Sequence, residues 1–245
     1  MSTRIGGASI AVALTALMLG GSSAMAATVA YTGSGAFSSI SGCNSGSPGC
    51  SISNTSNGSN TLLDMSGHNN STLEAIKITD SFSLTSPQNN VTIGELRWTN
   101  NASTSTDQNF NVTYTFTLSF TSPNNSSDSQ AFTLNIQQPT NPPGDTVSSL
   151  SALVLSGLGP FTLNGVTMSD IHFATSPGSH STYNSSTGSW YNPEGDTSNL
   201  LIEADFAPTA TPLPATLPLF AGGLGFVGYL ARRRKKNSNQ PLASA

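Results

Sequence analysis

The chain has 245 residues, enough for one mid-sized domain or two small ones. Serine, threonine and asparagine account for 91 residues, and charged residues for only 8% against roughly 25% in an ordinary soluble domain, which argues against a typical cytosolic enzyme. The segment from Thr28 to Ala210 contains all twelve carboxylates of the chain but only two cations, Lys77 and Arg97, so its net charge is −10. This charge excludes a nucleic-acid-binding surface.

Residues 1–26 have the three parts of a secretory signal peptide. Arg4 gives a positive start, residues 8–19 are apolar, and Ala24 and Ala26 form an A-x-A exit with cleavage expected after Ala26. Twelve helical residues span about 18 Å, short of the roughly 30 Å hydrocarbon core of a bilayer. We therefore expect Sec-type export machinery to recognise this segment; an uncleaved anchor or a buried helix is the alternative.

Cys43 and Cys50 are the only cysteines, and they lie in a loop rich in serine and glycine. In an exported protein, two cysteines this close are expected to form a disulfide. A zinc site built on the same pair would need two more ligands, and none stands nearby in the sequence.

Residues 27–207 are predicted to form one β domain. In the clearest strand, residues 110–120, six large apolar or aromatic residues alternate with small polar ones, which indicates a half-buried strand. No helix longer than one or two turns is expected between 28 and 210. Further strands are expected at 76–84, 91–99, 132–136, 152–155, 161–168, 171–174 and 200–206.

Turn sequences separate these strands. Asn164-Gly165 between apolar flanks is a tight-hairpin signal, and Pro/Asn/Gly-rich turns stand at 86–90, 122–125 and 141–145. About eight short strands with one apolar face each predict an all-β fold, a single antiparallel β-sandwich. The lack of crossover helices excludes a parallel α/β fold, and a solenoid is the second choice although no fixed repeat period is found.

The order of these segments resembles a known family. Gly94–Asn100 (GELRWTN), a long aromatic strand, Phe132–Ile136 (FTLNI) and Thr140–Asp145 (TNPPGD) are similar to the choice-of-anchor β domains of type K, over roughly 80–206. The resemblance implies an exported β domain that occurs with alternative C-terminal anchors. It implies no particular biochemical activity.

Candidate catalytic residues are sparse. His68 and His180 lie in polar loops and His172 lies in a strand, without an H-E-x-x-H motif or another close metal pair. No G-x-S-x-G motif is present to position a catalytic serine. We therefore expect no enzyme activity, no cofactor and no resident metal.

The carboxylates and aromatics leave alternatives open. Glu194 and Asp196 have the spacing of Ca²⁺ ligands but also of an ordinary turn, whereas Glu203 and Asp205 are expected on the solvent face of a strand. Three aromatics are candidates for a sugar-stacking platform, with core or rim positions as the favoured interpretation: Trp98, Trp190 and Tyr191. The negative charge disfavours acidic polysaccharide unless a divalent cation bridges the two.

Residues 217–231 form a second apolar segment, which contains four glycines and no charge. Five cations follow it directly: Arg232, Arg233, Arg234, Lys235 and Lys236. Cations just beyond an apolar span favour the cytoplasmic side, so this arrangement predicts a transmembrane helix with the β domain outside and residues 232–245 as a basic cytoplasmic tail. A buried core helix is the alternative.

A Pro-rich linker, residues 208–216, precedes this segment and contains Thr211, Pro212, Leu213, Pro214 and Ala215. Together with the glycine-rich span and the basic cluster, it resembles the PEP-CTERM sorting signal in its VPLPA variant, with Thr211 in place of valine. The resemblance covers Thr211 to about Lys236, and nine residues follow the cluster. It implies export in a Gram-negative bacterium that makes exopolysaccharide, and processing by a membrane enzyme, an exosortase. A Pro-rich juxtamembrane linker is the alternative.

These features together predict an exported protein that is transiently anchored in the inner membrane and then reaches the cell surface or extracellular matrix. The expected role is structural or adhesive, with extracellular polysaccharide as a candidate partner and no nucleic acid. A secreted glycan-binding or glycan-hydrolysing protein is the alternative. A pair of carboxylates in a cleft of the folded domain would favour the hydrolase, because glycosidases need such a pair.

Overall fold

The computed structural model describes residues 27–43, 50–54, 60–65, 70–102, 108–139, 144–159, 161–209, 222–229 and 232. The chain divides into two units, Ala24–Ala210 and the two ends Met1–Ser23 and Thr211–Ala245. The predicted signal peptide, the sorting motif at 211–215 and the cations at 233–236 lie outside the described residues.

Within the predicted membrane segment, residues 222–229 are helical. The large apolar side chains of this helix, from Leu224 to Tyr229, are 59–64% exposed. In the described part of the chain, no helix is both long and apolar enough to cross a bilayer. The span from 217 to 231 therefore stays a prediction.

The unit Ala24–Ala210 consists of thirteen described strands and one short helix, α1 (Ala152–Leu155). The strands are β1 (Ala27–Ser41), β2 (Ser51–Asn54), β3 (Thr61–Met65), β4 (Ser71–Ile76), β5 (Ile78–Leu84), β6 (Gln88–Thr99), β7 (Gln108–Ser122), β8 (Ser126–Gln138), β9 (Asp145–Ser148), β10 (Val166–Thr175), β11 (Thr182–Asn184), β12 (Ser189–Asn192) and β13 (Thr197–Pro208).

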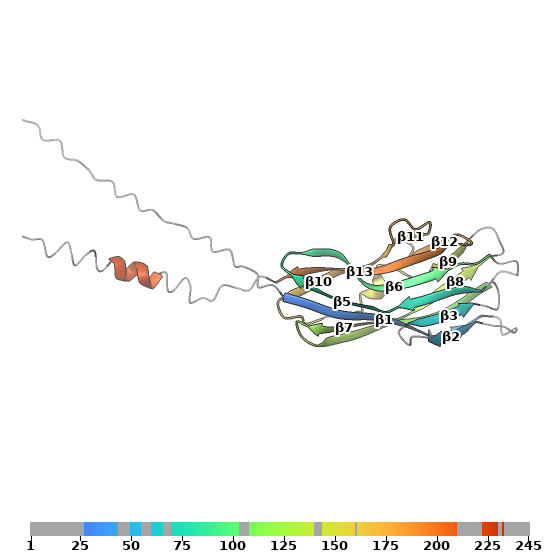
Figure 1. Cartoon of the computed structure of the whole chain (residues 1–245), viewed down its shortest axis with the longest axis horizontal. Helices are drawn as coiled ribbons and strands as arrows, with labels where there is room; N and C mark the ends of the chain where they lie inside the picture. Colours follow the sequence, from blue (N-terminus) through green and yellow to red (C-terminus); the bar gives the residue numbers. More distant parts are fainter. Residues whose placement is uncertain are drawn as a thin grey trace, which may run out of the picture. The chain divides into compact units, whose positions relative to one another are not determined.

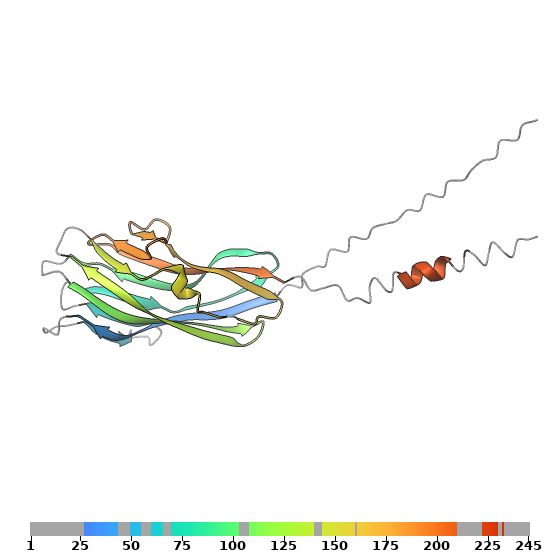
Figure 2. The ribbon, with the colours of Figure 1, turned by 180° about the vertical axis from the view of Figure 1, so that it is seen from behind.

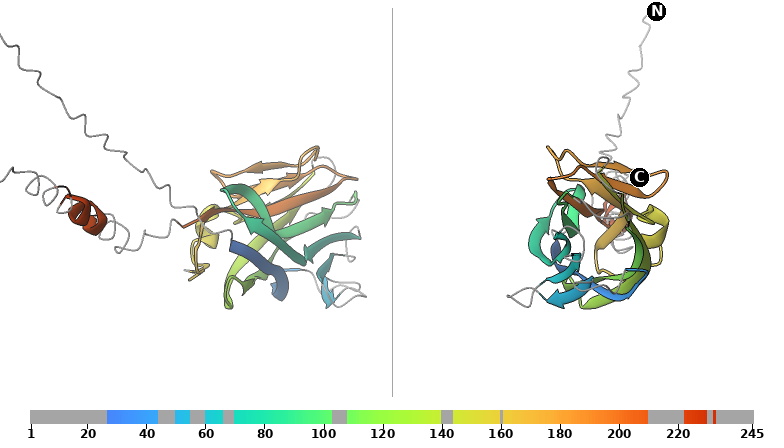
Figure 3. Two further views of the ribbon diagram at one scale, coloured as in Figure 1. Left: turned by 60° about the vertical axis from the view of Figure 1, so that its left-hand side comes forward. Right: turned by 90° about the vertical axis from the view of Figure 1, so that its right-hand side faces the viewer.

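These strands form two antiparallel sheets that lie face to face, as Figures 1 and 2 show from opposite sides. Sheet A has the order β11-β12-β9-β8-β7-β1-β5, and sheet B has the order β10-β13-β6-β4-β3-β2. Figure 3 adds a view along the domain, in which the strands surround the interior. The prediction of an all-β antiparallel sandwich is confirmed.

The alternation predicted for residues 110–120 is the clearest feature of β7. Every second side chain from Phe110 to Phe120 is at most 2% exposed, and the residues between them are partly exposed. The same holds for β13, where the predicted inward residues, Leu200 to Phe206, are completely buried. One apolar face per strand is what allows two sheets to enclose a common core.

One predicted strand, residues 76–84, is two strands that belong to different sheets. β4 ends at Ile76 in sheet B and β5 begins at Ile78 in sheet A, with Lys77 between them. The backbone N–H of Lys77 donates to Asn60 instead of to a neighbouring strand. The buried apolar residues of β4, Leu73 and Ala75, have odd numbers, whereas Leu84 of β5 has an even number, so the inward register changes at this crossing.

Two further predictions are corrected near the edge of sheet B. Residues 152–155 are a helical turn, because a short apolar run suits a buried helix as well as a strand. Residues 161–163 are in no strand, so Asn164-Gly165 makes a turn but not a hairpin. Strand β10 begins only at Val166 and includes the predicted segment 171–174.

The two ends of the sandwich differ in what they carry. At one end, which we call the terminal end, β1 begins beside the end of β5 and β13 finishes beside the start of β6 (Figure 1). The stacked rings of Tyr31 and Phe206, with centroids 6.3 Å apart, hold β1 and β13 together across the sheets. At the opposite end, which we call the distal end, β6, β8 and β12 finish and the turn 193–196 lies.

Between the two ends, β1 and β6 approach each other closely at a point that we call the waist. Ile93 has no pairing partner in β13, which makes a bulge in β6. The Ile93 carbonyl oxygen lies 1.6 Å from where a Cβ on Gly33 would stand. Only glycine fits this inward position of β1, because any side chain would collide with the backbone of the other sheet.

We expect Phe116→Asp to lower the free energy of unfolding by about 4 kcal/mol, because it places an unpaired charge in the core. Thr117→Asp, one residue along on the outward face, should change stability by less than about 1 kcal/mol. Urea denaturation followed by tryptophan fluorescence measures both. Equal losses for the two variants would contradict the observed burial of β7.

Gly33→Ala should destabilise the domain by about 3 kcal/mol, because relief of the contact with Ile93 requires the sheets to move apart. Ser34→Ala is the matched control, since Ser34 is partly exposed in the same strand. Thermal unfolding of the two variants provides the comparison. A Gly33→Ala protein as stable as Ser34→Ala would show that the waist is not tightly packed.

Candidate functional site

Buried polar side chains gather at the distal end of the sandwich. Asn192 of β12 donates from its amide to the carbonyl oxygens of Trp98, at 3.1 Å, and of Asp196, at 3.3 Å. Asn100, just after β6, donates to the carbonyl oxygen of Asn192 at 2.8 Å. Both asparagines are completely buried. Because β12 belongs to sheet A and β6 to sheet B, these bonds join the two sheets.

The indole rings of Trp98 and Trp190 form an edge-to-face pair beside these asparagines, with centroids 5.3 Å apart. Both side chains are completely buried, so they provide no exposed platform for a sugar ring. The side chain of Tyr191 lies on the opposite face of β12 from Trp190, and its hydroxyl accepts a hydrogen bond from the Gly144 N–H at 3.2 Å. The two tryptophans therefore occupy the core, the position favoured by the sequence.

The carboxyl groups of Asp145 and Glu194 interact with each other at the same end of the sandwich. Asp145, the first residue of β9, is completely buried, and its Oδ2 accepts a hydrogen bond from Nε2 of Gln138 at 3.0 Å. Burial, and secondarily the charge and hydrogen bonding of Glu194, raise the pKa of Asp145 to about 7, while the Gln138 bond opposes this shift. The site thus contains a carboxyl group that changes protonation near neutral pH.

Asp196 and Glu194, the pair considered for Ca²⁺, have separate partners. Asp196 Oδ2 lies 3.1 Å from Nδ1 of the exposed His180, whereas Glu194 interacts with the buried Asp145. Among the described residues, no three His, Cys, Asp or Glu side chains are grouped so that they could hold a metal. The sequence spacing of residues 194 and 196 therefore does not bring them to a common point, and the turn interpretation holds.

The other predicted residues are dispersed. His172 contacts the Asp170 carbonyl oxygen at 2.7 Å and lies 3.6 Å from Glu203 on the adjacent strand, and His68 lies outside the described residues. Glu203 and Asp205 alternate with buried residues of β13, as expected for the outward face. Cys43 and Cys50 form the predicted disulfide.

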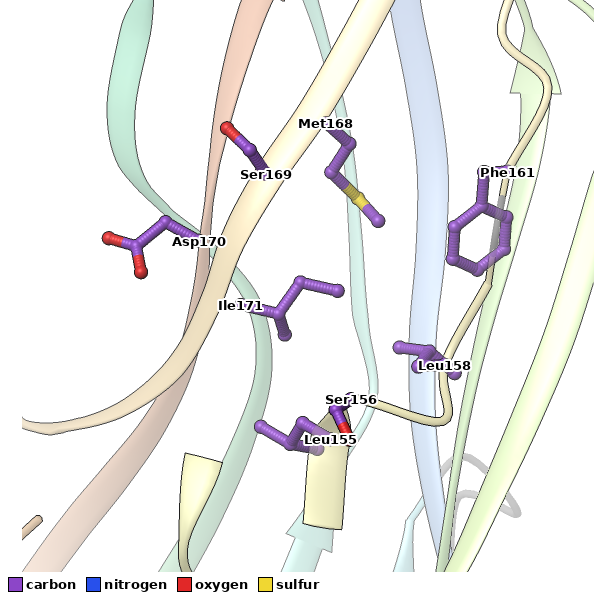
Figure 4. A pocket seen from close by; sticks show the side chains of 8 residues that line it. All are labelled: Leu155, Ser156, Leu158, Phe161, Met168, Ser169, Asp170 and Ile171. Carbon is purple, nitrogen blue, oxygen red and sulfur yellow. The ribbon is translucent and has the colours of Figure 1, made fainter. Parts of the chain in front are cut away.

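An apolar groove lies on the side of the sandwich, between α1 with its following loop and the edge strand β10 (Figure 4). Its volume is about 370 Å³, and Met168 and Ile171 point into it from β10. These two residues share a side because a bulge follows Ser169, where Asp170 has a φ of 51°. The remaining lining residues are Leu155, Ser156, Leu158, Phe161, Ser169 and Asp170.

A smaller polar hollow of about 280 Å³ lies beside Arg97. Its guanidinium lies 3.6 Å from the carboxylates of both Glu74 and Glu95. One of the two cations of the β domain is thus already paired with acidic side chains, which leaves this hollow poorly suited to an anionic ligand.

The polar residues Gln138, Asp145, Asn192 and Glu194, which we call the distal cluster, were not predicted from the sequence as a group. The sequence nevertheless contains a signal for two of them. Gln138 continues the inward alternation of β8 after Leu134 and Ile136, and Asn192 does the same after Trp190. A polar residue at an inward position of a strand must have a partner in the interior. The alternation therefore shows that Gln138 and Asn192 point inward and need a polar partner, although it does not identify that partner.

Comparisons with known proteins add no relative, since no family, no curated protein and no solved structure matches this chain.

The pKa of Asp145 predicts how stability changes with pH. The group titrates near 3.8 when exposed and at about 7 in the fold, so its contribution to stability is full below about pH 4 and is lost as pH rises through 7. Urea denaturation, with EDTA present to remove any metal ion, should give a higher midpoint urea concentration at pH 5 than at pH 8. Asp145→Asn should reduce this difference, and an unchanged difference would contradict the assignment.

Proposed function

We propose that this chain is an exported surface or extracellular-matrix protein, sorted by a PEP-CTERM-type C-terminal signal, whose β-sandwich is a structural or adhesive module. The observation that carries the proposal is that β1 begins and β13 finishes at the same end of the sandwich (Figure 1). Attachment through the terminal end leaves the distal end free to contact partners. A module built this way suits a tether that follows β13 directly.

The disulfide and the outward faces support this role. A bond between Cys43 and Cys50 is typical of proteins in oxidising compartments outside the cytoplasm. On the outer face of sheet A, hydroxyl groups pair across strands, as in Thr117 with Ser129 at 2.8 Å and Ser119 with Ser127 at 2.7 Å. Such an uncharged polar face is suited to a hydrated matrix, because it needs no counterions.

In this proposal, the Sec-type machinery exports the chain and residues 217–231 halt it in the inner membrane. The cations at 232–236 retain the tail in the cytoplasm, and an exosortase-like enzyme of a Gram-negative bacterium processes the chain near 211–215. The mature protein then resides at the cell surface or in the matrix, where polysaccharide is the candidate partner.

A glycan hydrolase is the rival function, and the Asp145–Glu194 pair is the arrangement that would favour it. The burial of Asp145 argues against that role, because a glycosidic bond cannot reach a carboxyl group with no exposed surface. We therefore retain the structural or adhesive role.

Removal of residues 216–245 should release a soluble, folded ectodomain, because it deletes both the apolar segment and the cations. Cell fractionation with an antibody to the ectodomain measures this. Removal of residues 237–245 alone is the matched control and should leave the protein in the membrane fraction or processed as in the intact chain.

Neutral replacements of Arg232–Lys236 should weaken the stop and let some chains pass completely through the membrane. The same antibody then detects uncleaved, full-length chains outside the cell. Retention of the 216–245 deletion in the membrane fraction, as complete as that of the intact chain, would contradict the proposed anchor.

A further inference from the structure

Four oxygen-bearing side chains meet inside the distal end. Asn192 pairs directly with Asp145 between β12 and β9, and the β8–β9 register places Gln138 beside Asp145 on the other side. All three are inward positions of adjacent strands, at most 1% exposed. Glu194, two residues beyond Asn192, reaches the same place, since its side chain interacts with Asp145.

Two amide oxygens of this group, Gln138 Oε1 and Asn192 Oδ1, are buried and accept no hydrogen bond within the described residues, and they flank the Asp145–Glu194 carboxyl pair. The orientations of the amides are fixed by their nitrogens, which donate to Asp145 Oδ2 from Gln138 and to two backbone carbonyls from Asn192. A buried acceptor without a donor is costly, and two of them beside a buried carboxyl pair require a common explanation.

A cation satisfies such a group better than further hydrogen bonds within the protein. Two carboxyl groups and two amide carbonyls lie on neighbouring positions here, and a positive charge among them would offset the repulsion between Asp145 and Glu194. The donors are all oxygens, the set preferred by hard cations, whereas Zn²⁺ favours nitrogen and sulfur ligands. Mg²⁺ requires near-ideal octahedral geometry and retains waters, whereas Ca²⁺ accepts irregular sets of six to eight oxygens.

We propose that the distal cluster is a Ca²⁺ site whose ligands are Gln138 Oε1, Asn192 Oδ1 and the carboxylates of Asp145 and Glu194. This site differs from the Glu194–Asp196 arrangement that the sequence suggested, because Asp196 has His180 as its partner. It does not depend on how the chain is sorted.

A bound ion would link three strands of sheet A to the turn 193–196. That turn is attached to sheet B by Asn100, whose N–H donates to the Asp196 carbonyl and whose carbonyl accepts from Gly195. Calcium would therefore lock the two sheets together at the distal end. Because the ion binds only the folded chain, it should raise the unfolding temperature.

The test uses the purified full-length protein in detergent, with CaCl₂ as the probe. Isothermal titration calorimetry should show one Ca²⁺ per chain, and 5 mM CaCl₂ should raise the unfolding temperature by about 5 °C over EDTA. The same concentration of MgCl₂ should raise it by less than about half as much. No binding and no shift at 5 mM CaCl₂ would overturn the proposal.

Variants separate ligation from structure. Asp145→Asn and Glu194→Gln should each abolish the calcium-induced shift, yet remain folded in EDTA because either change removes the repulsion between the carboxylates. Asp196→Asn, on the same turn, is the matched control and should retain the shift. Loss of the shift in Asp196→Asn, or its survival in both Asp145→Asn and Glu194→Gln, would overturn the proposed ligand set. Circular dichroism in EDTA confirms that each variant compared is folded.

Discussion

The hydrogen bonds of Asn192 fix the two sheets to each other where their apolar layers end. Its side chain donates into sheet B at Trp98, while Asn100 donates back to its carbonyl oxygen. Water cannot replace these bonds, because both residues are completely buried, and a lost partner would leave a polar group unsatisfied in the core. The tryptophan pair and the position of Glu194 beside Asp145 both depend on this join.

Alternation alone was enough to predict β7 and β13, because each has one continuous apolar face, whereas in β8 it marked only residues 132–136. It missed β1, the longest strand together with β7, since Gly33 and Gly35 occupy positions where large apolar residues would complete the pattern. It could not predict the distal cluster either, because the bond from Asn100 to Asn192 spans 92 residues. Sequence parity shows that a side chain points inward, whereas only the pairing of strands decides which side chains meet there.

One edge strand and one sheet face show how a chain with so little charge can limit indiscriminate strand pairing. Strand β10 is an edge strand of sheet B, and its bulge at Ser169–His172 interrupts the regular row of hydrogen-bonding groups. On sheet A, serine and threonine hydroxyls are paired with each other across strands, so they present few unsatisfied groups. The bulge and the hydrogen bonds between hydroxyl groups thus limit unwanted strand pairing, a role that charged side chains have in most soluble domains.

The waist at Gly33 lies between two groups of aromatic rings that belong to one continuous core. The rings around Tyr31 and Phe206 lie on the terminal side of the waist, and the tryptophan pair with its polar neighbours lies on the distal side. Groups that share no contacts respond to substitution independently, so the energetic effects of changes on the two sides should be additive.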